Sequence, residues 1–213
     1  MKSLVLVPTE TERLVLHDGL VSATAGEPIE LCGFGVVAAA ARTMAALARH
    51  RPERVLLVGI AGAIDGHLPL GAARRFGSVA CYGIGVGTGV DFSPAGAVGW
   101  PQWPGDDGTP TIGDVIPLDV LAADARAAPM LLTACAASAC AADVQQRRRL
   151  FPAAVAEYLE GFGVALACRL HGVPCAIIRG ISNVAGERDK ARWATAEAVA
   201  AAATLARDFL SES

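Results

Sequence analysis

The stretch Phe151–Trp193, FPAAVAEYLEGFGVALACRLHGVPCAIIRGISNVAGERDKARW, decides the fold. Its small and apolar residues predict a buried helix that begins at Glu160. A Gly-Val-Pro turn then leads into a short apolar strand, Cys175–Ile178. Ligands bind beside the carboxyl ends of strands in open α/β sheets, so we expect Glu160 and the polar pair Ser182 and Asn183 to face one crevice.

The composition and charge limit the number of domains and the classes of partner. The 213 residues are enough for one domain, 1–213, and the mean hydropathy of +0.43 comes from alanine and glycine. No apolar run reaches about 18 residues without a charge or a proline, and the N-terminus reads as a strand rather than a signal peptide. A net charge of −3 leaves no basic footprint for nucleic acid. We therefore expect a cytoplasmic protein with no membrane or nucleic-acid partner.

The six cysteines form neither a CxxC pair nor a framework of small loops. They lie in apolar stretches, as buried thiols of a reducing compartment do. The segment Cys168-x-x-His171-x-x-x-Cys175 has a superficial metal-ligand spacing, but it crosses from a helix through a turn into a strand and offers no fourth ligand. We interpret it as structural and expect no bound metal.

Two acids, Glu10 and Glu12, follow the first predicted strand, Leu4–Val7. Side chains at this place point into the crevice of an open sheet, but first-turn acids also complement a helix dipole. The same structural alternative applies to Glu160, and Ser182–Asn183 could serve only as a helix cap. The residue types alone leave both interpretations open.

Strands and helices alternate along the whole chain. Further strands are predicted over 28–32, 55–58, 78–82 and 130–133, and helices over 36–50, 117–127, 142–150 and 190–210. A proline-rich loop over 92–111 is long enough for a lid or an oligomer contact. This alternation predicts a single three-layer α/β domain with a mixed, largely parallel central sheet flanked by helices.

Two glycine motifs follow predicted strands. Gly33-x-Gly35-x-x-Ala38 is similar to a dinucleotide-binding fingerprint, but no acid that could hold a ribose appears before Asp65. Close packing of helix on strand is the favoured interpretation of these glycines. The second motif, residues 59–62, reads as a strand-to-loop turn whose glycines let backbone N–H groups approach a ligand.

Several motifs occur in one order from the first strand almost to the last helix. They are PTETE at 8–12, GFG at 33–35, VGIAGA at 58–63, FP at 151–152, YLEG at 158–161, RGISN at 179–183 and GERD at 186–189. In this order and spacing they resemble the nucleoside phosphorylase/nucleosidase superfamily, and within it the futalosine hydrolase family. Residues 64–130 are less distinctive. The resemblance implies a nucleoside phosphorylase-like fold.

The resemblance also implies roles for particular residues. Purine N-ribosidic cleavage passes through a ribosyl cation-like state, as in glycoside hydrolysis. Glu160 would accept hydrogen bonds from the ribose 2′- and 3′-hydroxyls, and Glu12, rather than Glu10, would deprotonate the attacking water. Further substrate contacts are implied for Tyr158, Leu159, Ala61, Gly62 and Ser182, the last orienting Asn183 or the base.

Asn183 departs from the superfamily's commoner pattern, in which an Asp protonates the leaving purine. An amide offers a base both a donor and an acceptor, which suits a 6-oxopurine such as hypoxanthine. Hypoxanthine is also a better leaving group than adenine. Residues 59–62 carry no hydroxyl and no Gly-Asp-Pro-x-Arg sequence follows the first strand, so we expect water rather than phosphate as the nucleophile.

The expected activity is hydrolysis of futalosine to hypoxanthine and dehypoxanthine futalosine in the alternative menaquinone route, by a homo-oligomer without metal or organic cofactor. Phe92, Trp100 and Trp103 could receive the 5′ arm of the substrate, or could serve loop packing or a subunit contact. We interpret Arg147–Arg149 as a solvated helix face and Arg188–Asp189 as a structural ion pair.

Three alternatives remain at this point. The protein could be another purine nucleosidase, acting on methylthioadenosine, adenosylhomocysteine, aminofutalosine or inosine. It could bind a nucleoside or dinucleotide without turnover, as the glycines at 33 and 35 suggest. It could also be a family member that has lost activity through Asn183.

Overall fold

The main sheet has nine strands within the part of the chain that the structure describes. The computed structural model describes residues 2–16, 26–64, 66, 68–106, 108–119 and 128–211. The strands are β1 (Ser3–Val7), β2 (Ile29–Leu31), β3 (Arg54–Ala63), β4 (Ala73–Arg75), β5 (Ser78–Tyr82), β8 (Val115–Pro117), β9 (Met130–Ala134), β10 (Ala154–Tyr158) and β11 (Cys175–Val184). Their order is β2-β1-β3-β10-β9-β5-β8, and β11 pairs with β3 and β4. The pairs β10–β3, β11–β4 and β5–β8 are antiparallel and the others parallel.

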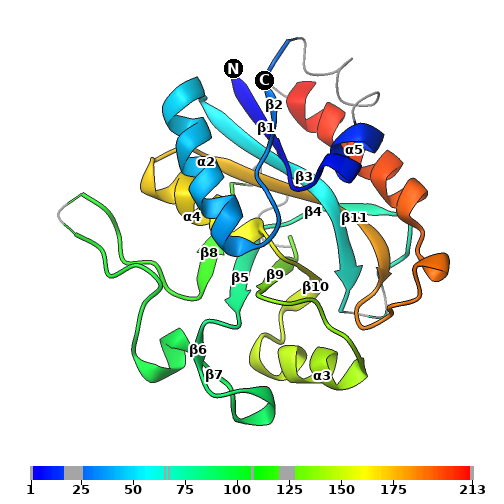
Figure 1. Ribbon diagram of the computed structural model, residues 1–213. Coiled ribbons are helices and arrows are strands. Elements are labelled where there is room, and N and C mark those ends of the chain that lie inside the picture. The colour runs from blue at the N-terminus through cyan, green and yellow to red at the C-terminus, as the bar shows by residue number, and fades with distance from the viewer. Residues whose placement is uncertain are drawn as a thin grey trace.

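Alternate side chains of the strands enter two different cores. Leu4 and Leu6 of β1 pack into the core under α2 (Val36–His50) and α4 (Gly161–Leu170). Val5 and Val7 pack on the opposite face, into the core under α5 (Thr195–Ser211). This follows from the two-residue period of a strand. The result is three layers, with α2 and α4 on one face of the sheet and α5 on the other (Figure 1).

Two glycines set how closely these layers approach. A Cβ at Gly163 of α4 would collide with the carbonyl oxygen of Val36 in α2, and one at Gly180 of β11 would collide with that of Ala198 in α5. Backbone atoms cannot move aside as a flexible side chain can. Any larger residue at either position would therefore push a helix away from its neighbour.

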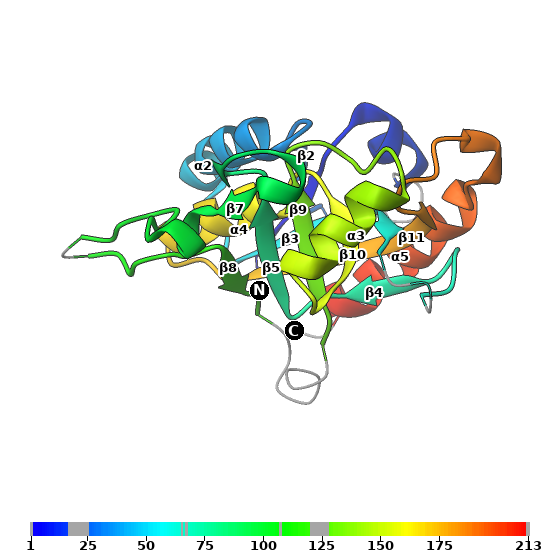
Figure 2. The same cartoon turned by 90° about the horizontal axis from the view of Figure 1, so that it is seen from below.

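The sheet divides beside β3. On one edge, β3 pairs with β1 as far as Leu57 and with β10 only from Gly62 onward, so residues 58–61 lie at a fork between the two strands. The other edge of β3 is paired with β11 along its length. Beyond the fork, α3 (Ala141–Leu150) covers β9 and β10 (Figure 2) over a small core that includes Leu132 and Phe151.

The region between β5 and β9 is less regular. It contains β6 (Gly85–Val86), β7 (Ser93–Pro94) and the 3₁₀ turns η1 (Gly89–Asp91) and η2 (Ala95–Val98). A bridge between Trp103 and Ile112 then starts an arm that projects from the body of the molecule (Figure 1). The prediction of an irregular stretch over 92–111 is confirmed for its described residues.

The predicted fold class is confirmed. The helix over 36–50 has the expected bounds, and the helices after residue 141 and from Glu160 agree to within a residue. The last helix is divided into a 3₁₀ turn, Lys190–Arg192, and α5. Among the described residues, no helix is both long enough and apolar enough to cross a bilayer.

Other predicted boundaries were wrong. β3 and β11 continue well past Val58 and Ile178, so residues 59–62 belong to a strand and do not form a turn. The two strands pair with each other throughout, and that long-range pairing overrides the local turn signal of the glycines. β10 was not anticipated. The helix predicted over 117–127 is wrong at Pro117, which ends β8, and residues 120–127 lie outside the described part.

Candidate active site

Glu12 enters the site from the helical turn at 10–16. Thr9 caps this turn by accepting a hydrogen bond from the Glu12 N–H at 3.3 Å, and its hydroxyl donates to Oε2 of Glu12 at 2.7 Å. Oε1 of Glu12 accepts the Ile60 N–H at 3.1 Å, at the fork in the sheet. Glu12 is only 9% exposed, whereas Glu10 points outward and pairs with Arg13. Of the two acids, the fold thus places Glu12 inside the protein and leaves Glu10 at the surface.

Glu160 is the residue before α4 and is fully buried. Its Oε1 accepts the Gly35 N–H at 2.8 Å, so the glycine turn before α2 binds a carboxylate of its own chain. Burial raises the pKa of the Glu160 carboxyl, against the lowering effects of the Gly35 hydrogen bond, the nearby Tyr158 hydroxyl and the charge of Arg179. Within the described residues, Oε2 has no partner with full hydrogen-bond geometry.

Arg179 is the residue whose importance the sequence did not reveal. It lies inside β11, fully buried, with its guanidinium carbon 3.7 Å from the ring centroid of Tyr158. A Cβ at Gly59 would lie 2.5 Å from Nη1 of Arg179 and 2.6 Å from Oε1 of Glu12, so both groups occupy the space that Gly59 leaves empty. None of its three guanidinium nitrogens has a hydrogen-bond partner among the described residues.

Ser182 and Asn183 lie near the end of β11. The pairing of β11 with β3 shifts register between Ile181 and Asn183, and such a bulge re-aims the side chains beside it. The Ser182 hydroxyl donates to Oδ1 of Asn183 at 2.8 Å and lies 3.3 Å from the Ala61 carbonyl oxygen. Nδ2 of Asn183 donates to the Val184 carbonyl at 2.8 Å. These contacts fix the amide and leave it one N–H for a ligand.

The groups named so far gather along one short segment of β3. Gly59 borders Glu12 and Arg179, and a Cβ at Gly62 would lie 3.3 Å from Nδ2 of Asn183. Glu160 belongs to the same group because its pKa responds to the charges of both Arg179 and Glu12. The arrangement combines two carboxylates, one guanidinium and one oriented amide, which can bind a polar ligand and move a proton.

Neighbouring residues complete the surroundings of these groups. Tyr158 and Leu159 are half-buried between β10 and α4, and Ala61 is buried in β3. Burial raises the pKa of the Cys32 thiol to about 12, so this residue stays neutral beside the carboxylates. Among the described residues there is no group of three or more His, Cys, Asp and Glu side chains placed to hold a metal ion.

Comparison with known proteins identifies the family. A model of the phosphorylase superfamily matches residues 128–211. A futalosine hydrolase of Thermus thermophilus is 34% identical over 187 residues, which cover 84% of this chain and 79% of that protein. The chain belongs to the futalosine hydrolase family.

One further comparison agrees with this membership, and another agrees with the fold. A futalosine hydrolase of Streptomyces coelicolor is 36% identical over 151 residues, or 70% of this chain, and the match spans 61% of that relative's length. The structure of futalosine hydrolase from Helicobacter pylori superposes with a TM-score of 0.78, covering 100% of this chain and 98% of that one. Its 15% identity makes this a likeness of fold alone.

Some side chains of this futalosine hydrolase family member differ from expectation. Arg147 does not belong to a solvated face, because it is buried and paired with Glu157, while Arg148 and Arg149 are exposed. The ion pair after β11 joins Arg192 to Glu187, and Asp189 instead accepts the Ala191 N–H.

The three aromatic candidates for the 5′ arm occupy different environments. Phe92 is buried against Tyr82, with ring centroids 4.9 Å apart. Trp103 lies in the projecting arm and donates from Nε1 to the Thr109 hydroxyl at 3.0 Å. Trp100 is 68% exposed. Loop packing accounts for Phe92 and Trp103, and Trp100 is the one of the three that is free to meet a partner.

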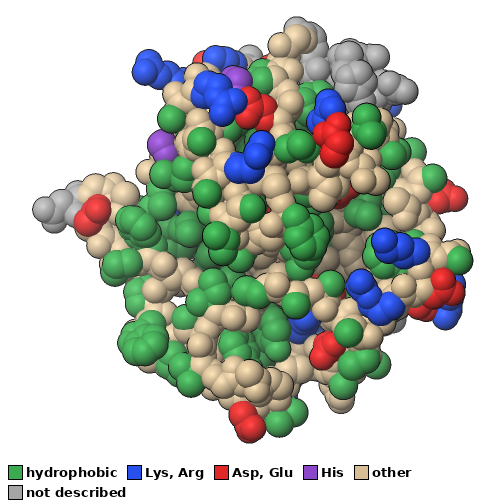
Figure 3. Space-filling view, in the orientation of Figure 1, with side chains coloured by type: hydrophobic (Ala, Val, Ile, Leu, Met, Phe, Trp, Pro, Cys, Tyr) green, Lys and Arg blue, Asp and Glu red, His purple; other side chains and the backbone are tan. Residues whose placement is uncertain are grey.

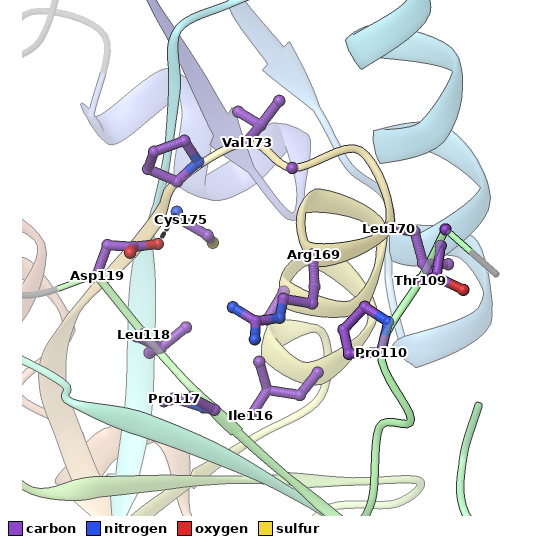
Figure 4. Close-up of a pocket in the computed structure, with 14 residues that line it drawn as sticks. Thr109, Pro110, Ile116, Pro117, Leu118, Asp119, Arg169, Leu170, Val173 and Cys175 are labelled. Carbon is purple, nitrogen blue, oxygen red and sulfur yellow. Dashed lines mark hydrogen bonds between the residues drawn. The ribbon is translucent and has the colours of Figure 1, made fainter. Parts of the chain in front are cut away.

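A cavity of about 390 Å³ lies at the opposite end of β11 from Asn183. It is formed by the projecting arm, the carboxyl end of α4 and the turn before β11 (Figure 4). Arg169 points into it, and Asp119 across it accepts the Cys175 N–H at 2.8 Å. None of the predicted site residues of this family member lines it, so the cavity is distinct from the candidate active site.

Proposed function

We propose that this protein hydrolyses the N-ribosidic bond of futalosine, releasing hypoxanthine and dehypoxanthine futalosine in the alternative menaquinone route. The observation that carries the proposal is the meeting of Glu12, Glu160 and Arg179 at the fork of the sheet, where Oε2 of Glu160 has no partner among the described residues. Buried polar atoms are normally hydrogen-bonded, so an oxygen in this position is suited to a ligand's hydroxyl groups.

Glu160 binds the ribose in this proposal. Gly35 already uses Oε1, which fixes the carboxylate and leaves Oε2 to accept from the 2′- and 3′-hydroxyls. Hydrogen bonds to an ionised carboxylate are roughly twice as strong as neutral ones. They also strengthen as positive charge develops on the ribose in the transition state, and this difference accelerates the reaction.

Glu12 activates the attacking water. Its carboxylate is held by Ile60 and Thr9 and retains free lone pairs on both oxygens. The water oxygen bonds to C1′ as the bond from C1′ to the base breaks, and Glu12 takes one proton from the water. The base leaves with the bonding electron pair and takes up a proton from solvent.

Asn183 binds the departing base. Ser182 and the Val184 carbonyl hold its amide in one orientation, with an N–H free to donate to a carbonyl oxygen of the base. A 6-oxopurine offers such an oxygen, and a 6-aminopurine does not. Ala61 and Gly62 form the floor beneath the base, and Tyr158 and Leu159 border the ribose.

Arg179 stabilises the ionised site. The buried guanidinium lowers the pKa of the Glu160 carboxyl against the effect of burial, and stacking on Tyr158 holds it in place. Water is favoured over phosphate as the nucleophile because the backbone N–H groups at 59–62 are not free to bind an anion. The Ile60 N–H donates to Glu12, and residues 59–62 are paired within a strand. A phosphate dianion would also be repelled by the two carboxylates.

A cytoplasmic homo-oligomer is part of the proposal. All six cysteines are free thiols, as in proteins of reducing compartments. Large apolar side chains are exposed on α2 and between β6 and the arm, among them Val37, Val90 and Trp100. Apolar side chains gather over the lower left of the face in Figure 3. Large apolar patches mark contact surfaces, and light scattering of the purified protein would give the assembly state.

The deciding experiment measures base release by chromatography after incubation of the purified protein with futalosine. Aminofutalosine, methylthioadenosine and inosine are run in parallel, each with and without phosphate. A Glu160→Ala preparation purified in the same way reports contamination by host nucleosidases. We expect hypoxanthine from futalosine at a rate that phosphate does not change.

Other outcomes would replace the proposal with a specific alternative. Adenine from the amino substrates would identify a different purine nucleosidase. A phosphorylated ribose product that requires phosphate would identify a phosphorylase. No release from any substrate would indicate a binding protein or an inactive family member.

A further inference from the structure

A buried charged network lies behind the base side of the site and has no part in the mechanism above. Arg147 of α3 and Glu157 of β10 form an ion pair, and the two side chains are 5% and 6% exposed. Ser138, from the loop after β9, joins them: its hydroxyl donates to Oε2 of Glu157 at 2.7 Å and accepts from Nη1 of Arg147 at 2.5 Å. A buried ion pair carries a large desolvation penalty, and hydrophobic residues of similar volume often replace one without loss. Stability alone is therefore a weak explanation for it.

The network fixes the loop 135–140 at three points. Oε1 of Glu157 accepts the Ser138 N–H at 2.7 Å, and Nη2 of Arg147 donates to the Ala136 carbonyl at 2.7 Å. The Ser138 hydroxyl is the third point. The two charged side chains thus satisfy backbone groups that no strand or helix pairs, and so they determine the path of the loop.

This loop reaches from one side of the candidate active site to the other. Just before its start, the Thr133 hydroxyl of β9 accepts the N–H of Phe162, two residues after Glu160, at 2.7 Å. At its end, a Cβ on Gly186 would lie 3.0 Å from the carbonyl group of Cys140. Gly186 closely follows Asn183 in the chain. The loop therefore spans the distance between the proposed ribose-binding and base-binding groups.

The network also shares a row of the sheet with Asn183. Gly62 pairs with Glu157 of β10 on one edge and with Asn183 of β11 on the other. Residues paired across neighbouring strands project from the same face. Glu157 and Asn183 thus stand on either side of Gly62, where a Cβ would lie 3.3 Å from Nδ2 of Asn183, and Ser138 covers Glu157 on the loop side.

We propose that Arg147 and Glu157 are positioning residues, which hold the loop 135–140 as the wall of the base subsite opposite Asn183. The ligand that this wall meets is a 6-oxopurine base. The inference rests on the proposed function for the identity of the base, but its test does not require turnover. The network touches no reacting atom and acts through the loop.

The test compares Arg147→Met with Arg148→Met. Both remove one positive charge from the same helix, but Arg148 is exposed and has no ion-pair partner among the residues that the structure describes. Calorimetry measures hypoxanthine binding to each protein, and futalosine kinetics give kcat and KM. For Arg147→Met we expect hypoxanthine affinity to fall about tenfold and KM to rise by a similar factor. The value of kcat should change less than about threefold, because the lost contact with the base weakens the ground state and the transition state equally. Arg148→Met should stay within about twofold of wild type.

A milder variant guards against loss of folding. Ser138→Ala removes one hydroxyl but keeps the bond from its N–H to Glu157, and we expect hypoxanthine affinity to fall about threefold. A lower melting temperature in Arg147→Met or Ser138→Ala with unchanged hypoxanthine affinity would overturn the proposal and leave a purely structural ion pair. Failure of wild type to bind hypoxanthine would also overturn it. If the wild-type protein binds hypoxanthine but cleaves no nucleoside, the proposed function is refuted. The proposal that Arg147 and Glu157 position a wall of the base subsite would still hold in that case.

Discussion

The two acids of the first helical turn offer a matched pair of substitutions, Glu12→Gln and Glu10→Gln. They change the same functional group on the same turn, but Glu12 points into the fork of the sheet and Glu10 pairs with Arg13 in solvent. Glutamine at position 12 keeps an oxygen for the Ile60 N–H, and the Thr9 hydroxyl can rotate to accept from the new amide. The shape of the site and most of its hydrogen bonds should survive.

The expected loss is therefore chemical. A glutamine amide cannot take a proton from water, and removal of a positioned general base costs about 10²- to 10⁴-fold in rate. This corresponds to about 3–5 kcal/mol of transition-state stabilisation at 1.36 kcal/mol for each factor of ten. Hypoxanthine affinity should stay within about threefold of wild type, because Glu12 lies away from the base. For Glu10→Gln we expect less than a twofold change in kcat, since an exposed ion pair contributes little.

Single-turnover release of hypoxanthine measures the chemical step, and calorimetry measures base affinity in the same preparations. Comparable losses in the two variants would refute the assignment of Glu12, because they would show an effect of charge rather than of position. Full activity in Glu12→Gln would equally exclude it as the base. A parallel loss of hypoxanthine affinity would show that the substitution had disturbed the whole site.

Three further predictions concern other parts of the site. Asn183→Asp should raise the ratio of adenine to hypoxanthine release about tenfold or more, because a protonated carboxyl at this position can give its proton to the leaving base and an amide cannot; an unchanged ratio would contradict the role in base choice. Burial raises the pKa of Glu160 above its ordinary 4.5. The unfolding free energy of the wild-type protein should therefore fall, relative to that of Glu160→Gln, as the pH rises from about 4.5 through the raised pKa. Above that pKa the difference between the two proteins should stay constant. Urea unfolding from pH 4 to 8 measures this, and a difference of opposite sign would refute it. Gly59→Ala should lower the unfolding free energy by about 1–3 kcal/mol and reduce activity, because its Cβ would lie 2.5 Å from Nη1 of Arg179. Gly113→Ala, where the Cβ would meet open space, is the matched control, and equal stability of the two variants would count against the crowded geometry.

The sequence by itself determined several of the regular elements and indicated the family. The helix at Val36–His50 and the strand at Ser78–Tyr82 have the expected bounds, because periodicity, glycine and proline act within a few residues of one another. The order of the short motifs indicated the superfamily, and the resemblance preferred Glu12 to Glu10. The roles of Glu12, Glu160 and Asn183 remain predictions until the variants are measured.

Only the tertiary structure decided how distant residues meet. Gly59–Gly62 has the local composition of a turn, yet it continues a strand because β11 pairs beside it. Arg179 and Arg147 read as ordinary polar residues, but each is buried where a strand or a helix turns it inward, against Tyr158 in one case and Glu157 in the other. A local pattern carries no information about a partner far away in the chain. The burial of these charged side chains and their pairing depend on such distant partners. Only the folded structure therefore shows them.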